Sequence, residues 1–134
     1  MIYRELIYKI RGCIFEVYNT LGKGLLESAY EAALFHELKL CGLDVKSQVQ
    51  LPVIYKDLHI DNAFRIDLLV ENAVIIEIKS VKELSEAHLK QLSNYLHLSH
   101  LTIGLLVNFN TDNLEDNIKS SVNSYRQFNE VKKN

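Results

Sequence analysis

Apolar side chains recur with a helical period along the first forty residues. From residue 2 to residue 20 they lie three or four positions apart, which predicts an amphipathic helix with one buried face. These positions are Ile2, Leu6, Ile10, Cys13, Ile14, Val17 and Leu21. Gly22 and Gly24 interrupt the pattern. A second helix is predicted from about residue 25 to residue 41, with Gly42 as its C-terminal cap.

The middle of the chain is predicted to form strands. The first covers residues 45–55, with Pro52 at an edge or a bulge because proline cannot donate a ladder hydrogen bond. A turn at Lys56-Asp57 leads into a second strand that continues through Asp67. Residues 73–79 would form the hairpin partner of this strand.

The second half of the chain alternates helix and strand. Ser85 is a suitable N-cap for a helix over residues 86–98, and the apolar stretch 101–109 predicts another strand. The polar tail is predicted to be helical around 113–127 and frayed at 131–134. The order ααβββαβ predicts a single α/β domain over residues 1–134, a central mixed sheet flanked by helices.

Composition favours a globular protein without a membrane span. The 134 residues are 48% hydrophobic, which is ordinary for a globular domain. No apolar run approaches the roughly 20 residues of a membrane span, and no signal peptide is recognisable, so we expect a cytoplasmic protein without membrane contact. Cys13 and Cys41 lack CxxC spacing, and His97 and His100 have no cysteine nearby. We therefore expect both cysteines to be buried free thiols, and we expect no zinc site.

The net charge of −2 disfavours a tight, free-standing DNA-binding protein, because DNA affinity depends largely on Lys and Arg neutralising phosphates. It does not disfavour an enzyme that recruits a metal ion.

Charged side chains interrupt two apolar strands at Asp67, Glu77 and Lys79. A hairpin register can be chosen that keeps every apolar pair, and a slip by one residue would break these pairs. That register pairs Val70 with Val74, Leu68 with Ile76, Ile66 with Ile78, and Asp67 with Glu77. Two carboxylates about 4 Å apart repel by roughly 4 kcal/mol at an effective dielectric constant of about 20, and a cation such as Mg²⁺ would relieve this repulsion. The alternative is a partly exposed hairpin in which Lys79 simply neutralises Glu77.

Two further pairs of polar residues have ordinary structural explanations when each is taken alone. Glu27 and Tyr30 share one face of the second helix, where a first-turn glutamate is favoured by the helix dipole. Gln91 and Tyr95 border the apolar stripe of the third helix, as in any amphipathic helix.

Taken together, these residues resemble the GxxExxY family, a branch of the PD-(D/E)xK nuclease superfamily. Gly24, Glu27 and Tyr30 match the motif that names the family. The acidic centre of the superfamily matches Asp67, Glu77 and Lys79, and the Gln-x-x-x-Tyr element of the RecB-like and Cas4-like branch matches Gln91 and Tyr95. The resemblance covers about residues 10–108. One departure is Ile66, which stands where the motif usually has proline.

The resemblance implies a restriction-endonuclease-like core and metal-dependent hydrolysis of phosphodiester bonds. Asp67, Glu77 and the carbonyl of Ile78 would hold Mg²⁺ or Mn²⁺, and Glu27 would reach the same ion directly or through water. Lys79 would orient the attacking water or stabilise charge on the phosphate. Gln91 would position the phosphate or a metal-bound water, with Tyr30 and Tyr95 in supporting roles. A phosphate contact from His88 is less expected than a structural role.

The expected substrate is nucleic acid, DNA rather than RNA, cleaved without base-sequence readout because the nuclease core occupies nearly the whole chain. Delivery by a partner protein and a homo-oligomer are both compatible with the sequence. The alternative is a catalytically silent nucleic-acid-binding or protein-interaction module on the same fold. A different metal hydrolase is a third, less favoured possibility.

Overall fold

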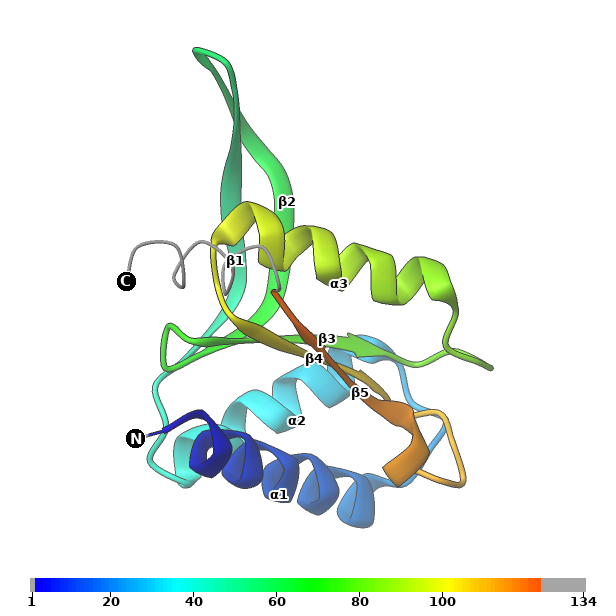
Figure 1. The fold of residues 1–134 in the computed structure, drawn as a ribbon. Helices are drawn as coiled ribbons and strands as arrows, with labels where there is room; N and C mark the ends of the chain where they lie inside the picture. The colour runs from blue at the N-terminus through cyan, green and yellow to red at the C-terminus, as the bar shows by residue number, and fades with distance from the viewer. Residues whose placement is uncertain (1, 124–134) are drawn as a thin grey trace.

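A five-stranded sheet lies between two helices on one face and one helix on the other. The computed structural model describes residues 2–123, and Figure 1 shows the three layers. The elements are α1 (Tyr3–Leu21), α2 (Glu27–Leu40), β1 (Val45–Tyr55), β2 (Leu58–Val70), β3 (Val74–Lys79), α3 (Glu86–Ser99), β4 (Ile103–Asn108), the 3₁₀ turn η1 (Glu115–Asn117) and β5 (Ile118–Val122).

The strands lie in the order β1-β2-β3-β4-β5. Only β3 and β4 are parallel, and α3 forms the crossover between them; the other neighbouring strands are antiparallel. One buried cluster joins α1 and α2 to the sheet, and a second joins α3 to its opposite face. The predicted α/β fold with a mixed sheet between helices is confirmed.

The helices begin and end close to their predicted limits. In α1 the buried positions are Leu6, Ile10, Cys13, Ile14 and Val17. At the end of α2, Gly42 has a φ of +82°, its N–H donates to the carbonyl of Lys39, and the N–H of Leu43 donates to that of Leu38. This is a Schellman motif, in which glycine accommodates the left-handed backbone. Ser85 caps α3 as predicted.

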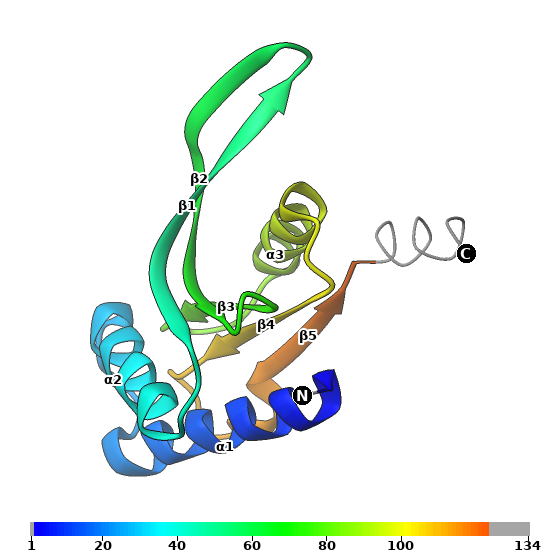
Figure 2. The ribbon, with the colours of Figure 1, turned by 90° about the vertical axis from the view of Figure 1, so that its left-hand side faces the viewer.

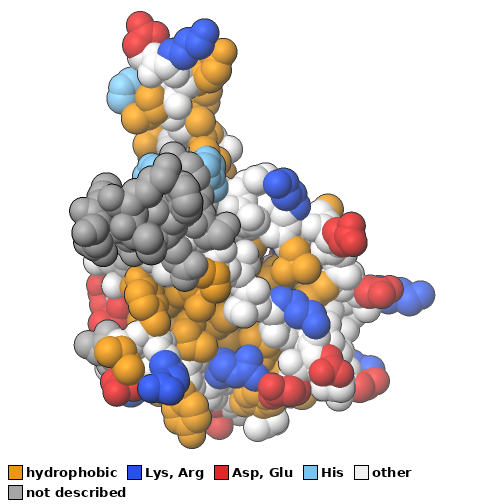
Figure 3. Space-filling model, viewed as in Figure 1, with side chains coloured by type: hydrophobic (Ala, Val, Ile, Leu, Met, Phe, Trp, Pro, Cys, Tyr) orange, Lys and Arg blue, Asp and Glu red, His pale blue; other side chains and the backbone are white. Residues whose placement is uncertain are grey.

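Strands β1 and β2 form a hairpin whose outer part, around the turn at residues 56–57, projects beyond the other elements (Figure 2). We call this outer part of the hairpin the arm. The register shifts between Leu51 and Val53, so Pro52 lies at a bulge on an edge strand as predicted. Hydrophobic side chains line part of the arm and charged ones stand at its tip (Figure 3). The exposed apolar residues of the arm are Ile54, Tyr55, Leu58 and Ile60.

The prediction of a helix around 113–127 is wrong within the described residues. Residues 115–117 form a single 3₁₀ turn, and residues 118–122 form β5. The described elements therefore follow the predicted order ααβββαβ and then add one more strand, β5. The backbone of β5 pairs with β4, and ladder hydrogen bonds outweigh the weak local preference of a short polar segment. Residues 124–127 and the predicted frayed end at 131–134 lie outside the described part of the chain.

The two cysteines differ in exposure. Cys13 is buried as predicted, but Cys41 is exposed because it follows the last turn of α2 at the protein surface. Between residues 2 and 123, no helix combines the length and apolar character that a membrane crossing requires.

Candidate functional site at the end of strand β3

Strand β2 separates from β3 at Asp67. The predicted pairs Val70–Val74 and Leu68–Ile76 are present, and the ladder ends at the second of them. The N–H of Ile78 then donates to Oδ2 of Asp67 over 2.8 Å. The predicted ladder pairs Asp67–Glu77 and Ile66–Ile78 are therefore wrong, because the ladder ends before them and the Asp67 side chain takes the N–H of Ile78. Ile66 and Ile78 join different hydrophobic clusters.

Glu77 is a buried carboxylate beside Asp67. Only 4% of its surface is exposed, and its Oε1 atom has no hydrogen-bond partner. Burial, together with the hydrogen bond and the charge of Asp67, raises the pKa of Glu77 to about 9, although Lys79 opposes the rise. Such an unsatisfied buried oxygen is costly in a folded protein, so this atom marks a place where a ligand would be stabilising.

Lys79 and α3 complete this face of the sheet. The Nζ atom of Lys79 lies 3.4 Å from Oε1 of Gln91. Tyr95, one turn further along α3, stacks on Phe64 of β2 with ring centroids 4.6 Å apart. Burial raises the pKa of Tyr95, as do the charges of Glu77 and Asp67. The predicted residues Asp67, Glu77, Lys79, Gln91 and Tyr95 thus lie together, and we call them the carboxylate site.

Glu27 enters from the other helical layer. It is the first residue of α2 and is exposed, and its charge is among the causes that raise the pKa of Glu31. The segment before it is tied to the end of β3, because the hydroxyl of Ser80 donates to the carbonyl of Leu25 over 2.6 Å. The start of α2 therefore lies beside the end of β3, the strand that carries Glu77 and Lys79.

Tyr30 supports the turn that precedes Glu27. Its hydroxyl donates to the carbonyl of Gly22 over 2.6 Å and accepts from the N–H of Leu25 over 3.2 Å. Its ring is fully buried and stacks on Phe109, with centroids 4.4 Å apart. The hydroxyl thus braces the backbone of the loop rather than a polar side chain of the carboxylate site.

Sequence reasoning missed a second carboxylate on α2. Glu31 is half-buried and accepts a hydrogen bond of 2.6 Å from Gln48. Its pKa is raised first by burial and further by the charges of Asp67 and Glu27, whereas Gln48 and Arg65 lower it. Because Glu31 is four residues after Glu27, both lie on one helix face. That spacing was the available signal.

Sequence reasoning also missed Asn108, at the end of β4. It is 1% exposed and lies beside Lys79 in the parallel register. Its Nδ2 donates to the carbonyl of Val81, and its Oδ1 accepts from the N–H of Val81, both over 3.0 Å. Asn108 therefore clamps the segment that follows Lys79. A lone asparagine ending an apolar strand was the only sequence signal.

His88 has a structural role. Its Nδ1 accepts from the N–H of Ser85 over 3.0 Å, and its own N–H donates to the Ser85 hydroxyl. These reciprocal bonds form a capping box at the start of α3, which agrees with the structural expectation for this histidine.

Comparisons with known proteins agree with this architecture. The chain is similar in fold to the crystal structure of SSO0001, with a TM-score of 0.51 and 22% sequence identity over 71% of this chain and 48% of that one. The chain thus spans about half the length of that structure. No curated protein sequence matches the chain significantly. The model of the PD-(D/E)XK nuclease superfamily matches residues 4–121, and the chain belongs to that superfamily.

Members of this superfamily generally use divalent metal ions, and the donor chemistry of the site fits such an ion. Its donors are carboxylate oxygens, which Mg²⁺ and Mn²⁺ prefer, and one of them is the unpartnered Oε1 of Glu77. Among the described residues, the ligand atoms of Glu27, Asp67 and Glu77 are not all within 4.8 Å of one another. A single ion shared by these three side chains, with the carbonyl of Ile78, stays a prediction.

Proposed function

We propose that the protein is a metal-dependent nuclease that hydrolyses phosphodiester bonds in nucleic acid, DNA in preference to RNA. The observation that supports this most strongly is Glu77. A carboxylate that is 4% exposed, next to Asp67 and with one oxygen unpartnered, is unfavourable in the absence of a cation. Placed in the acidic centre of a PD-(D/E)XK chain, it is suited to binding a divalent ion.

In this proposal Asp67 and Glu77 hold Mg²⁺ or Mn²⁺, with the carbonyl of Ile78, while Glu27 contributes directly or through water. When bound, the ion supplies Lewis-acid polarisation of the phosphate and lowers the pKa of the attacking water. The hydrogen bond from the Ile78 N–H fixes the Asp67 carboxylate and supports this role. Glu31, near Glu27 and Asp67, adds negative charge that favours cation binding.

Lys79 stabilises the negative charge that develops on the phosphate or orients the attacking water. Gln91 positions the phosphate beside it, a role supported by the 3.4 Å contact between Lys79 Nζ and Gln91 Oε1. Tyr95 has a supporting role, because stacking on Phe64 fixes the position of its ring.

Within the superfamily, we assign the chain to the GxxExxY family and to the RecB-like and Cas4-like branch. Gly24, Glu27 and Tyr30 support the first assignment, and Gln91 and Tyr95 support the second. The hydrogen bonds of the Tyr30 hydroxyl to Gly22 and Leu25 give the tyrosine of this motif a physical reason. It fixes the turn from which Glu27 starts α2.

We also propose that cleavage follows the shape or the ends of the nucleic acid rather than its bases. All the residues assigned here would act on the phosphate or the ion, and none on base edges. A net charge of −2 provides little general attraction for DNA, so a partner protein that delivers the substrate fits the proposal.

A cleavage assay tests the function. Purified protein is incubated with single-stranded, duplex and branched DNA and with RNA, in Mg²⁺, in Mn²⁺ or in EDTA. We expect cleavage of DNA with either metal, none in EDTA, and none by the Asp67→Asn variant. Binding without cleavage under every condition would support the silent module instead.

A further inference from the structure

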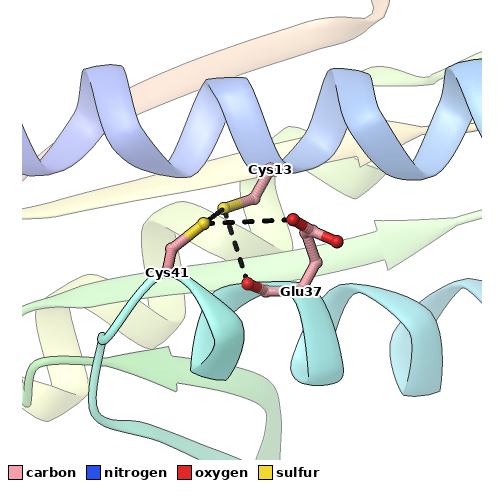
Figure 4. Close-up of side chains that lie close together, drawn as sticks. All are labelled: Cys13, Glu37 and Cys41. Carbon is pink, nitrogen blue, oxygen red and sulfur yellow. Dashed lines mark hydrogen bonds between the residues drawn. The ribbon is translucent and has the colours of Figure 1, made fainter.

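A second group of metal-ligating side chains lies far from the carboxylate site, between α1 and α2. Cys13 comes from the middle of α1, Glu37 from the last turn of α2, and Cys41 directly follows α2 (Figure 4). Their ligand atoms all lie within 4.8 Å of one another, and no other group of three in residues 2–123 meets this condition. We propose that Cys13, Glu37 and Cys41, the thiol site, bind one zinc ion or a similar thiophilic divalent cation.

The spacing of the donor atoms is close to that of a tetrahedral zinc centre. Zn–S distances of about 2.3 Å and a Zn–O distance of about 2.0 Å would place the sulfurs roughly 3.8 Å apart and sulfur and oxygen roughly 3.5 Å apart. The Sγ atoms are 3.2 Å apart, and Oε2 of Glu37 is 3.9 Å from Sγ of Cys41. These two separations differ from the tetrahedral values by about 0.6 Å and about 0.4 Å, and all three ligand atoms lie within 4.8 Å of one another.

The surroundings leave room for a fourth ligand. The three residues line an open hollow of about 480 Å³, which also contacts Lys9 and Glu16. A zinc site with three protein ligands commonly takes water in the fourth position. Lys9, in the lining of the same hollow, would offset part of the negative charge of two thiolates and a carboxylate when a metal is bound.

The chemistry selects the kind of metal. Two of the three donor atoms are cysteine sulfurs, which lie 3.2 Å apart. Sulfur ligands favour thiophilic cations such as Zn²⁺. Mg²⁺ prefers oxygen ligands, so the thiol site and the carboxylate site should take different metals.

A disulfide explains the arrangement less well. The sulfurs are farther apart than the roughly 2.05 Å of a disulfide bond, and a disulfide gives no role to the carboxylate of Glu37. A bound ion would use all three groups and would tie the end of α2 to the middle of α1.

The test uses reduced, metal-free full-length protein in excess Mg²⁺, so that oxygen sites are saturated, and adds Zn²⁺ or Co²⁺. We expect one zinc ion per chain, a thiolate-to-cobalt charge-transfer band in the near ultraviolet, and protection of Cys41 from alkylation. Because Cys41 is exposed, Cys41→Ser should fold normally and weaken zinc binding more than about a hundredfold, beyond the usual effect of changing an outer partner. Glu37→Gln should weaken it about tenfold, and Glu83→Gln, an exposed control, should not.

Three results would overturn the proposal. The first is zinc binding that Cys41→Ser leaves unchanged. The second is a cobalt spectrum without a thiolate band. The third is oxidation of the two thiols to a disulfide, detected as the mass loss of two hydrogen atoms, at the same rate with and without zinc.

Discussion

The carboxylate site and the thiol site are assembled in different ways. In the carboxylate site, Asp67, Glu77 and Lys79 lie on adjacent strands, where the register of β2 and β3 brings them together. In the thiol site, Cys13 and Cys41 are 28 positions apart and meet only because α1 packs against α2. Strand register can be inferred from apolar alternation, whereas the contact point of two helices cannot.

The two sites also differ in chemistry. The carboxylate site offers oxygen donors on a sheet, and the thiol site offers two sulfurs and one oxygen between helices. Hard cations prefer the first set and thiophilic cations the second. This difference makes the sites separable by experiment, since each should respond to its own metal and its own substitutions.

Among substitutions that leave the metal bound, the largest effect should come from Lys79→Ala. If Lys79 stabilises charge that develops only in the transition state, its loss should lower turnover about a hundredfold to a thousandfold with little change in metal affinity. Single-turnover cleavage assays and metal-induced thermal shifts measure the two quantities separately. Lys82→Ala, an exposed lysine nearby, serves as the control. Equal cleavage by Lys79→Ala and the parent would show that the role given to Lys79 is wrong.

Asp67→Asn should abolish metal binding at the carboxylate site and leave metal binding at the thiol site unchanged. The amide oxygen can still accept from the N–H of Ile78, so the fold should persist. The pKa of Glu77 is raised to about 9, so its carboxyl is protonated at neutral pH and the metal-free protein should melt at about the same temperature. The rise in melting temperature with Mg²⁺ or Mn²⁺ should disappear, while zinc binding should be unchanged. Calorimetry in each metal tests this, with Asp61→Asn on the arm as control. A normal Mn²⁺ shift in Asp67→Asn would contradict the assignment.

The sequence was sufficient where a local rule determined the structure. Apolar periodicity gave the buried face of α1, and glycine and serine chemistry gave the ends of α2 and α3. Alternation along the hairpin gave the pairs from Val70–Val74 to Leu68–Ile76. Asp67 and Glu77 do not form the predicted ladder pair, but they follow the last pair directly and their side chains are hydrogen-bonded, so their closeness was predictable.

The sequence was insufficient where the structure of a segment depends on backbone or side-chain partners that are distant in the chain. The segment 118–122 becomes β5 only because β4 offers a free edge. Ile66 leaves the predicted pairing because the Asp67 side chain takes a backbone N–H. Asn108 acquires its role from a loop 27 residues earlier in the chain. Such partners are set by tertiary packing, which no short pattern encodes.

The pH dependence of the carboxylate site should be opposite to that of a salt-bridged carboxylate. The pKa of Glu77 is raised to about 9 in the folded protein, against roughly 4.3 when unfolded. Its contribution to stability is fully present below the unfolded value and is lost as pH rises toward 9. Mg²⁺ binding requires the deprotonated form, so affinity should rise by up to about tenfold per pH unit over the same range.

Urea unfolding and Mg²⁺ titrations between pH 5 and pH 9 measure both effects. Glu77→Gln should flatten the stability profile and abolish the rise in affinity, whereas Glu83→Gln should change neither. Identical pH profiles for Glu77→Gln and the parent would mean that Glu77 is not the titrating group.

The smallest effect on turnover is expected from Asn108→Ala. This substitution removes both hydrogen bonds to Val81 and leaves a peptide group near the core unsatisfied, which should lower the free energy of unfolding by about 1–3 kcal/mol. The hydrogen bonds of the Asn108 side chain go to Val81, Asn110 and Asn117 and, among the described residues, to neither carboxylate of the site. Cleavage should therefore fall only a few-fold, and metal affinity should be unchanged. Asn94→Ala, an exposed change on α3, controls for the loss of an amide. If Asn108→Ala lowered cleavage as much as Lys79→Ala while remaining folded, Asn108 would act on the substrate itself, and its role as a clamp for the Lys79 segment would have to be abandoned.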